Sequence, residues 1–218
     1  SPDGKFMIFQ ALGKLYIQDV KSGKTRRLTK QSDHDEFYPR YSNDGTYIVY
    51  STWNDQKLGS IKMVSAKGGK GKTLTTEPGH YIEPSFSTDG KKVAYQKFSG
   101  GYLLPSKWSV NPGVYVLDVK SKKTKRVSKS GSAPHFAGDN SRVYFTQGVP
   151  GTDYPERQLV SVDLNGENKQ THLYGADKVQ EYRLSHDKKW IAFVEQYNVF
   201  VAPFADTGKK QNINSVMK

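Results

Sequence analysis

A short turn motif that recurs at regular intervals constrains the fold of this chain more than any other feature. Its clear copies place an aspartate two positions after a serine and follow it with a glycine, and two later copies are degenerate. The five copies are residues 1–5, 42–46, 87–91, 138–141 and 185–189. Their aspartates lie 41 to 50 residues apart, and self-similarity at such a period is typical of a repeat architecture.

Each copy of the motif leads into a short run rich in β-branched and aromatic residues, which is typical of strands. These runs are residues 6–9, 47–50, 92–95, 143–145 and 190–194. An Asp-Gly pair between two extended segments favours a tight hairpin, because these residues supply the positive φ angles of a primed turn. We therefore expect a strand on each side of the motif, followed in each repeat by two further strands.

Four short antiparallel strands that recur every 40 to 50 residues indicate a β-propeller rather than a sandwich. No segment has a sustained helical periodicity, and turn-forming residues interrupt the chain often. We predict an all-β fold, a β-propeller of four-stranded antiparallel blades with about five blades visible and the first one incomplete. The chain is expected to form a single propeller domain or a fragment of one. Its repeats span approximately residues 1–33, 34–78, 79–131, 132–175 and 176–218.

The strand before each turn carries two sets of aligned residues. One set is Tyr41, Phe86, Phe136 and Leu184, and the set one position earlier is Arg40, Ser85, His135 and Arg183. Side chains alternate between the two faces of a strand. The apolar set is therefore predicted to pack between blades, and the polar set to point the other way.

The first repeat begins at its turn and lacks the strand that precedes it in the other repeats. An unpaired edge strand invites aggregation, so a propeller needs its ring to close. Two interpretations stay open. Either the chain is a piece of a longer polypeptide, or its C-terminal segment, residues 211–216, pairs into the first blade.

The net charge of +12 is typical of proteins that bind nucleic acid or anionic lipid. The basic clusters, however, fall at equivalent places between the third and fourth strands of successive repeats, so we expect them around the outer perimeter of the propeller. They contain no interleaved aromatic residues, which a single-stranded nucleic-acid site needs. We predict no nucleic-acid partner. No apolar run is long enough to span a membrane, so we also predict no membrane insertion.

Two common signatures of nucleophilic catalysis are missing from the sequence. It has no cysteine, which excludes thiolate chemistry and disulfides and fits a reducing or an oxidising compartment. It also has no Gly-x-Ser-x-Gly nucleophile motif. The recurring aspartates are explained by the turns. We predict no catalytic residue and no cofactor in this chain.

The five histidines show no local metal-ligand spacing, so we predict no metal site. Some of them lie just before the innermost strands together with acidic residues, and these are expected to line one mouth of the channel. The candidate channel and mouth residues are His34, Glu36, Arg40, His80, Glu83, His135 and Arg183.

Two longer insertions, residues 98–112 and 147–157, interrupt the repeat. Loops on a rigid scaffold often carry recognition, and exposed aromatic side chains are typical of binding hot spots. The alternative is that these side chains pack back onto their own blades. The candidate partner-binding residues are Tyr102, Leu104, Trp108 and Tyr154.

The repeated segments resemble the WD40-like repeats of TolB-type β-propellers. The resemblance lies in FSTDGK at 86–91, VYVLD at 114–118 and RRLT at 26–29. A narrower resemblance, in EFYP at 36–39, STWND at 51–55 and LTTEPGHY at 74–81, is to bacterial proteins in which such a propeller precedes a metal-dependent amidohydrolase domain. These resemblances imply a periplasmic or secreted protein.

Two functions follow from the sequence. The first is a non-catalytic, TolB-like binding and interaction scaffold within a larger periplasmic protein, with a protein partner or a sister domain of the same polypeptide. The alternative is an accessory propeller that covers or gates the active site of an amidohydrolase, or of a serine peptidase, encoded beyond Lys218. The His-x-His metal pair of such hydrolases is absent here, so the resemblance transfers no catalytic residue. A propeller fold alone does not decide between the two.

Overall fold

The computed structural model describes residues 1–98, 110–149, 151, 156–175 and 179–213, and within them it contains five β-sheets and no helix. The first sheet has the order β1 (Phe6–Ala11), β2 (Lys14–Asp19), β3 (Thr25–Arg27). The second has the order β4 (Asp35–Tyr41), β5 (Tyr47–Trp53), β6 (Ser60–Ser65), β7 (Lys72–Thr73). The third runs β8 (Tyr81–Phe86), β9 (Lys92–Lys97), β10 (Gly113–Asp118), β11 (Thr124–Ser128).

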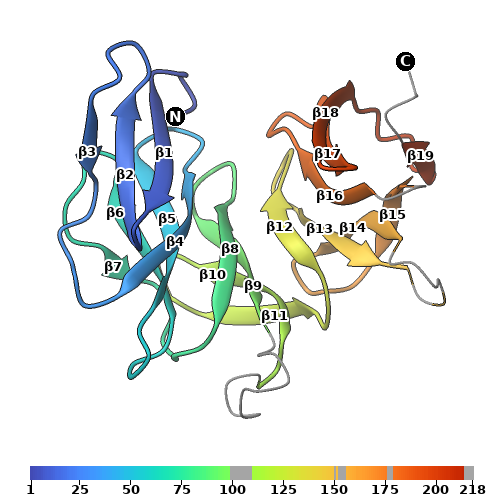
Figure 1. Ribbon diagram of the computed structural model, residues 1–218. Helices are drawn as coiled ribbons and strands as arrows, with labels where there is room; N and C mark the ends of the chain where they lie inside the picture. Colours follow the sequence, from blue (N-terminus) through green and yellow to red (C-terminus); the bar gives the residue numbers. More distant parts are fainter. Residues whose placement is uncertain (99–109, 150, 152–155, 176–178, 214–218) are drawn as a thin grey trace.

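The last two sheets differ from the others in strand number. The fourth has the order β12 (Ser132–Phe136), β13 (Arg142–Gly148), β14 (Arg157–Asp163), β15 (Gln170–Gly175), β19 (Gln211–Ile213). The fifth has three described strands, β16 (Val179–Leu184), β17 (Trp190–Glu195) and β18 (Asn198–Pro203). Figure 1 shows the sheets arranged radially, with the first and the fifth on opposite sides of an opening between the two ends of the array. The predicted all-β propeller with an incomplete first blade is confirmed, and each sheet is called a blade below.

Four apolar clusters hold the blades together, one at each contact between blades that follow one another in the chain. The cluster between the third and fourth blades, for example, packs Val114 and Val116 of β10 against Phe145 of β13. A single flat sheet cannot bury both of its faces, so each blade depends on its neighbours for its core.

The aligned apolar set behaves as predicted in three of its four positions. Phe86, Phe136 and Leu184 are buried between blades. Tyr41 is only half-buried, and it packs against the edge of the cluster between the first and second blades.

The turns differ from the predicted two-residue primed hairpins. Between β4 and β5 the loop spans residues 42–46, and only its glycine, Gly45, has a positive φ, of 72°. Gly45 N–H donates to Ser42 O (2.9 Å), and Asp44 Oδ1 accepts from the Ser42 hydroxyl (2.5 Å). The aspartate therefore fastens the turn through its side chain, and glycine alone supplies the left-handed residue.

The predicted pairing of residues 211–216 with the first blade is wrong for its described part. Strand β19 pairs in parallel with β15 at the outer edge of the fourth blade. Its Ile213 is buried in the cluster between the fourth and fifth blades, and this burial of apolar surface favours the observed pairing. As a result, the described part of the fifth blade has three strands, and β19 does not become the fourth.

Within the described ranges, no helix has the length and apolar character needed to cross a membrane.

Candidate functional site

The innermost strands of blades two to five each carry an irregularity, and in blades two to four it lies at the same place. The pairing register shifts between residues 37 and 40, 82 and 85, 132 and 135, and 179 and 181. In three of these bulges a residue other than glycine is left-handed, namely Tyr38 (φ 53°), Glu83 (φ 53°) and Ala133 (φ 54°). Such a conformation costs on the order of 1–2 kcal/mol per residue. Bulges re-aim side chains, and repeated strain of this kind clusters at functional sites.

The re-aimed side chains surround a cavity of about 300 Å³ at the centre of the propeller. Its walls come from β1, β4, β8, β12 and β16 and from the turn after β16, through Ile8, Arg40, Ser85, His135, Arg183 and His186, among others. We call this cavity the axial pocket. Its volume lies at the small end of the range for ligand sites, so it suits a small molecule or one group of a larger partner.

Arg183 is tied to two glutamates at this pocket. Its Nε donates to Glu181 Oε1 (2.9 Å), and its Nη2 lies 3.6 Å from Glu83 Oε1. The other oxygen of Glu83 accepts from the N–H of the left-handed Ala133 (2.6 Å). Glu83 thus connects the third blade to the bulge of the fourth blade and to the arginine of the fifth.

Both arginines keep donors that the protein does not satisfy. Arg183 Nη2 is buried and donates no hydrogen bond, and its Nη1 has only a 3.5 Å contact with Pro134 O. Among the described residues, the Arg40 guanidinium forms no hydrogen bond and no ion pair. Burial, and then the charge of Arg183, lower the pKa of Arg40 to about 10, against the opposing effect of Glu83 and Glu181. Arg40 is therefore still charged at neutral pH, with its donors facing the pocket.

His135 is held neutral. Burial first, and then Arg183, lower its pKa to about 3. Its Nε2 accepts from Leu184 N–H (3.0 Å), so Nδ1 carries the proton and donates to Ala133 O (2.8 Å). With both nitrogens engaged, His135 has no free lone pair for a metal or for proton transfer. No group of three or more potential metal ligands occurs in the described part of the chain.

His34 and Glu36 lie away from the axial pocket. Glu36 has no exposed surface, and its Oε2 accepts from Leu15 N–H (3.0 Å) and from the Thr29 hydroxyl (2.6 Å). Burial would raise the pKa of Glu36, but the nearby His34 ring and the hydrogen bonds from Thr29 and Leu15 outweigh it and lower the pKa. Glu36 is therefore an ionised carboxylate whose hydrogen bonds connect the first and second blades.

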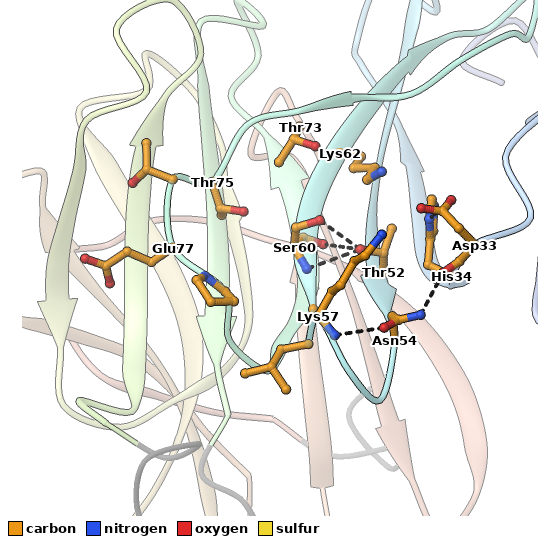
Figure 2. A pocket seen from close by; sticks show the side chains of 14 residues that line it. Asp33, His34, Thr52, Asn54, Lys57, Ser60, Lys62, Thr73, Thr75 and Glu77 are labelled. Atoms are coloured by element: carbon orange, nitrogen blue, oxygen red, sulfur yellow. Dashed lines mark hydrogen bonds and ion pairs between the residues drawn. The ribbon is translucent and has the colours of Figure 1, made fainter.

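His34 lines a second cavity, of about 210 Å³, at one end of the second blade. Figure 2 shows it beside Asp33, with which its Nδ1 makes a 2.8 Å contact. Across the cavity lie Lys57 and the paired hydroxyls of Thr52 and Ser60 (2.9 Å). The cavity holds cations and carboxylates together, among them Lys57, Lys62, Asp33 and Glu77.

His80 is packed between aromatic rings. Its ring centroid lies 5.2 Å from that of Trp53 and 5.3 Å from that of Phe98. Burial lowers its pKa. His80 thus belongs to a packed stack and lines neither of the two cavities.

Of the candidate channel residues, the structure brings together Arg40, Glu83, His135 and Arg183, and it separates His34, Glu36 and His80 from them. The candidate partner-binding residues Tyr102, Leu104, Trp108 and Tyr154 lie outside the described residues. Sequence reasoning missed Glu181 and His186. It also missed the bulges, for which a signal exists, because Pro39, Pro84 and Pro134 each follow a left-handed residue.

A serine, a histidine and an aspartate line up in the fourth and fifth blades in the order of a catalytic triad. Ser161 Oγ lies 2.7 Å from His172 Nε2, and His172 Nδ1 lies 3.5 Å from Asp206 Oδ1. Ser161 has no exposed surface, however, and its hydroxyl accepts from Arg142 Nε (2.8 Å). In this conformation no substrate can reach the hydroxyl, and the three groups act as a buried polar link.

The radial sheets, packed against one another in chain order, and the pocket on their common axis define the chain as a β-propeller. No family model matches it. Over 124 residues it is 32% identical to the Tol-Pal system protein TolB of Francisella tularensis subsp. holarctica (strain OSU18). That stretch covers 56% of this chain and only 27% of that protein.

Solved structures agree with this likeness. A putative TolB from Agrobacterium tumefaciens aligns with a TM-score of 0.74 at 17% identity, over 97% of this chain and 76% of that one. TolB from Acinetobacter baumannii aligns with a TM-score of 0.68 at 15% identity, over 93% of this chain and 50% of that one. At such identities these structures show the fold alone. Together, the sequence and structure comparisons confirm the resemblance to TolB-type β-propellers.

Proposed function

We propose that this chain is a non-catalytic binding scaffold of TolB type that receives a protein partner, or a sister domain of its own polypeptide, at the axial pocket. The observation that carries the proposal is the convergence of re-aimed polar side chains from separate blades on one cavity. The similarity to a Tol-Pal system protein supports a role in protein interaction. By the same likeness the protein works in the periplasm or outside the cell.

The chemistry of the axial pocket does not support catalysis. A hydrolytic site needs a positioned base or nucleophile, and His135 has both nitrogens engaged in hydrogen bonds to the backbone. The two arginines bind and orient but do not exchange protons near neutral pH. The pocket is therefore suited to recognition.

Site-specific photo-cross-linking tests the proposal. A benzoylphenylalanine at His186, an exposed residue that lines the axial pocket, is compared in cells with the same probe at Lys120, an exposed residue in the turn between β10 and β11. We expect a discrete protein adduct from His186 and none from Lys120. Absence of an adduct at His186, or the same adducts at both positions, would contradict the proposal.

The alternative function is an accessory propeller that covers the active site of an amidohydrolase, or of a serine peptidase, in the same polypeptide. Its support is the resemblance of three segments, and the structure gives two of them a packing role through the stack of Trp53 and His80. The sequence of the intact gene decides between the functions. Several hundred further residues with clustered histidine and aspartate ligands would favour the accessory propeller.

A further inference from the structure

The axial pocket contains an imbalance of hydrogen-bond donors over acceptors. Arg40 lines the pocket without a protein partner among the described residues, and Arg183 keeps a buried Nη2 that donates no hydrogen bond. A buried donor left without an acceptor costs about 1–3 kcal/mol. Arg183 on β16 keeps this buried unpaired donor, and Arg40 on β4 lines the same pocket with free donors, so the two guanidinium groups are matched by a ligand that supplies acceptor oxygens.

The chemistry of the two side chains defines that ligand. A guanidinium presents a planar fork of donors that fits the two oxygens of a carboxylate or phosphate. The neighbouring hydrogen bonds of His135 are already made. The arginines are thus the groups that remain free to bind.

The charge balance of the pocket selects between the two anions. Arg40 and Arg183 carry two positive charges, and Glu83 and Glu181, which contact Arg183, offset them with two negative charges. A carboxylate adds one negative charge to this set, whereas a phosphate near neutral pH adds close to two. Because like charges in a confined pocket repel, a carboxylate is the better fit.

We propose that Arg40 and Arg183 bind a carboxylate group that the protein partner inserts into the axial pocket. This inference rests on the proposed function, which supplies the partner. A cavity of about 300 Å³ has room for one acidic side chain or for a C-terminal carboxylate, while the rest of the partner lies outside it.

Calorimetric titration with three carboxylate probes tests the inference. The first is a short peptide with glutamate side chains and blocked termini, the second a neutral peptide with a free C-terminus, and the third sodium acetate. The glutamine version of the first peptide is the uncharged control. We expect at least one carboxylate probe to bind and the control not to bind, and the probe that binds identifies the source of the carboxylate.

Two variants and a matched control connect the binding to the arginines. Arg40→Gln is expected to weaken binding about tenfold or more, since a charged hydrogen bond is lost. Arg183→Gln is expected to do the same. Arg27→Gln, the same change on the exposed strand β3, should leave affinity unchanged. If Arg183→Gln does not fold, Arg40→Gln decides alone, since Arg40 holds no described partner.

The inference is overturned if no carboxylate probe binds, or if Arg40→Gln binds as tightly as the unmodified protein. These results are separable from the fate of the proposed function. A protein adduct at His186 that persists in Arg40→Gln, with unchanged peptide affinity, would leave the scaffold function standing without the carboxylate. Carboxylate binding through Arg40 without any protein adduct would support the carboxylate site and contradict the scaffold function.

Discussion

The third and fifth blades contain equivalent strands, β10 and β18, that differ in how far their side chains are buried. Val114 of β10 and Val199 of β18 occupy equivalent ladder positions, paired with Gln96 and Val194. Val114 is 0% exposed and Val199 is 72% exposed. The strands share their turn motif and their alternation, so the difference comes from the neighbours. The third blade packs against a neighbouring blade on each of its two faces. Among the described residues, no blade covers the face of the fifth blade that exposes Val199.

The first blade shows the same property as the fifth. Most of the large apolar side chains that the described part of the chain exposes belong to these two end blades, namely Phe6, Met7, Leu12, Val20, Trp190, Tyr197, Val199 and Val201. Burial in a radial repeat is therefore a property of the interface between repeats. The local sequence pattern predicts which residues can be part of the core, and the presence of a neighbouring blade determines whether they are buried.

The largest expected effect is at the matched valines. Val114→Asp places a carboxylate in the cluster between the third and fourth blades, and an unpaired buried charge costs about 3–5 kcal/mol. Val199→Asp places the same group on an exposed strand, where substitutions change stability by about 0.5 kcal/mol or less. Urea unfolding followed by circular dichroism measures both. Equal effects would show that β18 is covered in solution.

A smaller effect is expected at the contact between the first and second blades, where Glu36, a carboxylate with no exposed surface, accepts hydrogen bonds from the first blade. Glu36→Gln keeps the shape of the side chain but removes the charge that Leu15 and Thr29 bond, at a cost of about 2–3 kcal/mol. Because folding lowers the pKa of Glu36, its contribution is complete above the unfolded pKa of about 4.5. It is lost as the pH falls through the folded value.

Hydrogen exchange at the Leu15 amide, which donates to Glu36, measures this contribution most directly. The amide should exchange faster in Glu36→Gln, while amides of β13 in the fourth blade keep their protection. Uniform loss of protection across both blades would mean that the first blade does not open on its own.

His135 gives the contact between the fourth and fifth blades a different pH dependence. Its pKa falls from 6.5 to about 3 on folding, so between these values the unfolded chain binds more protons and stability decreases as the pH falls. From pH 7 to pH 5 the loss is about 2 kcal/mol. His135→Gln cannot titrate, and its amide oxygen can accept from Leu184 N–H. Its melting temperature should therefore change less over this range. An equally steep profile in this variant would assign the pH dependence to other groups.

The sequence predicts the parts of this structure that depend on one repeat or on the alignment of several. The turn motif locates the sheets, and the strand alternation separates buried Phe86 and Phe136 from Arg40 and Arg183, which line the axial pocket. That this pocket binds a partner stays a prediction. The role of Glu36 was not accessible in this way, because its hydrogen-bond donors Leu15 and Thr29 belong to another blade. Likewise, the pairing of β19 with β15 was not accessible from one repeat, because Ile213 is buried in the cluster between the fourth and fifth blades.

The smallest expected effect separates local from interblade stabilisation. Asp89 accepts from the Ser87 hydroxyl (2.6 Å) and from Lys91 N–H (3.1 Å), and Asp187 makes the same two bonds with Ser185 (2.5 Å) and Lys189 (3.1 Å). Each aspartate-to-alanine change should lower stability slightly, because it removes the same two hydrogen bonds. Since both networks lie within their own turns, the two costs should agree in urea unfolding even though the valines of the same blades differ. A much smaller cost for Asp187→Ala would mean that the fifth blade is already open before the rest of the propeller unfolds.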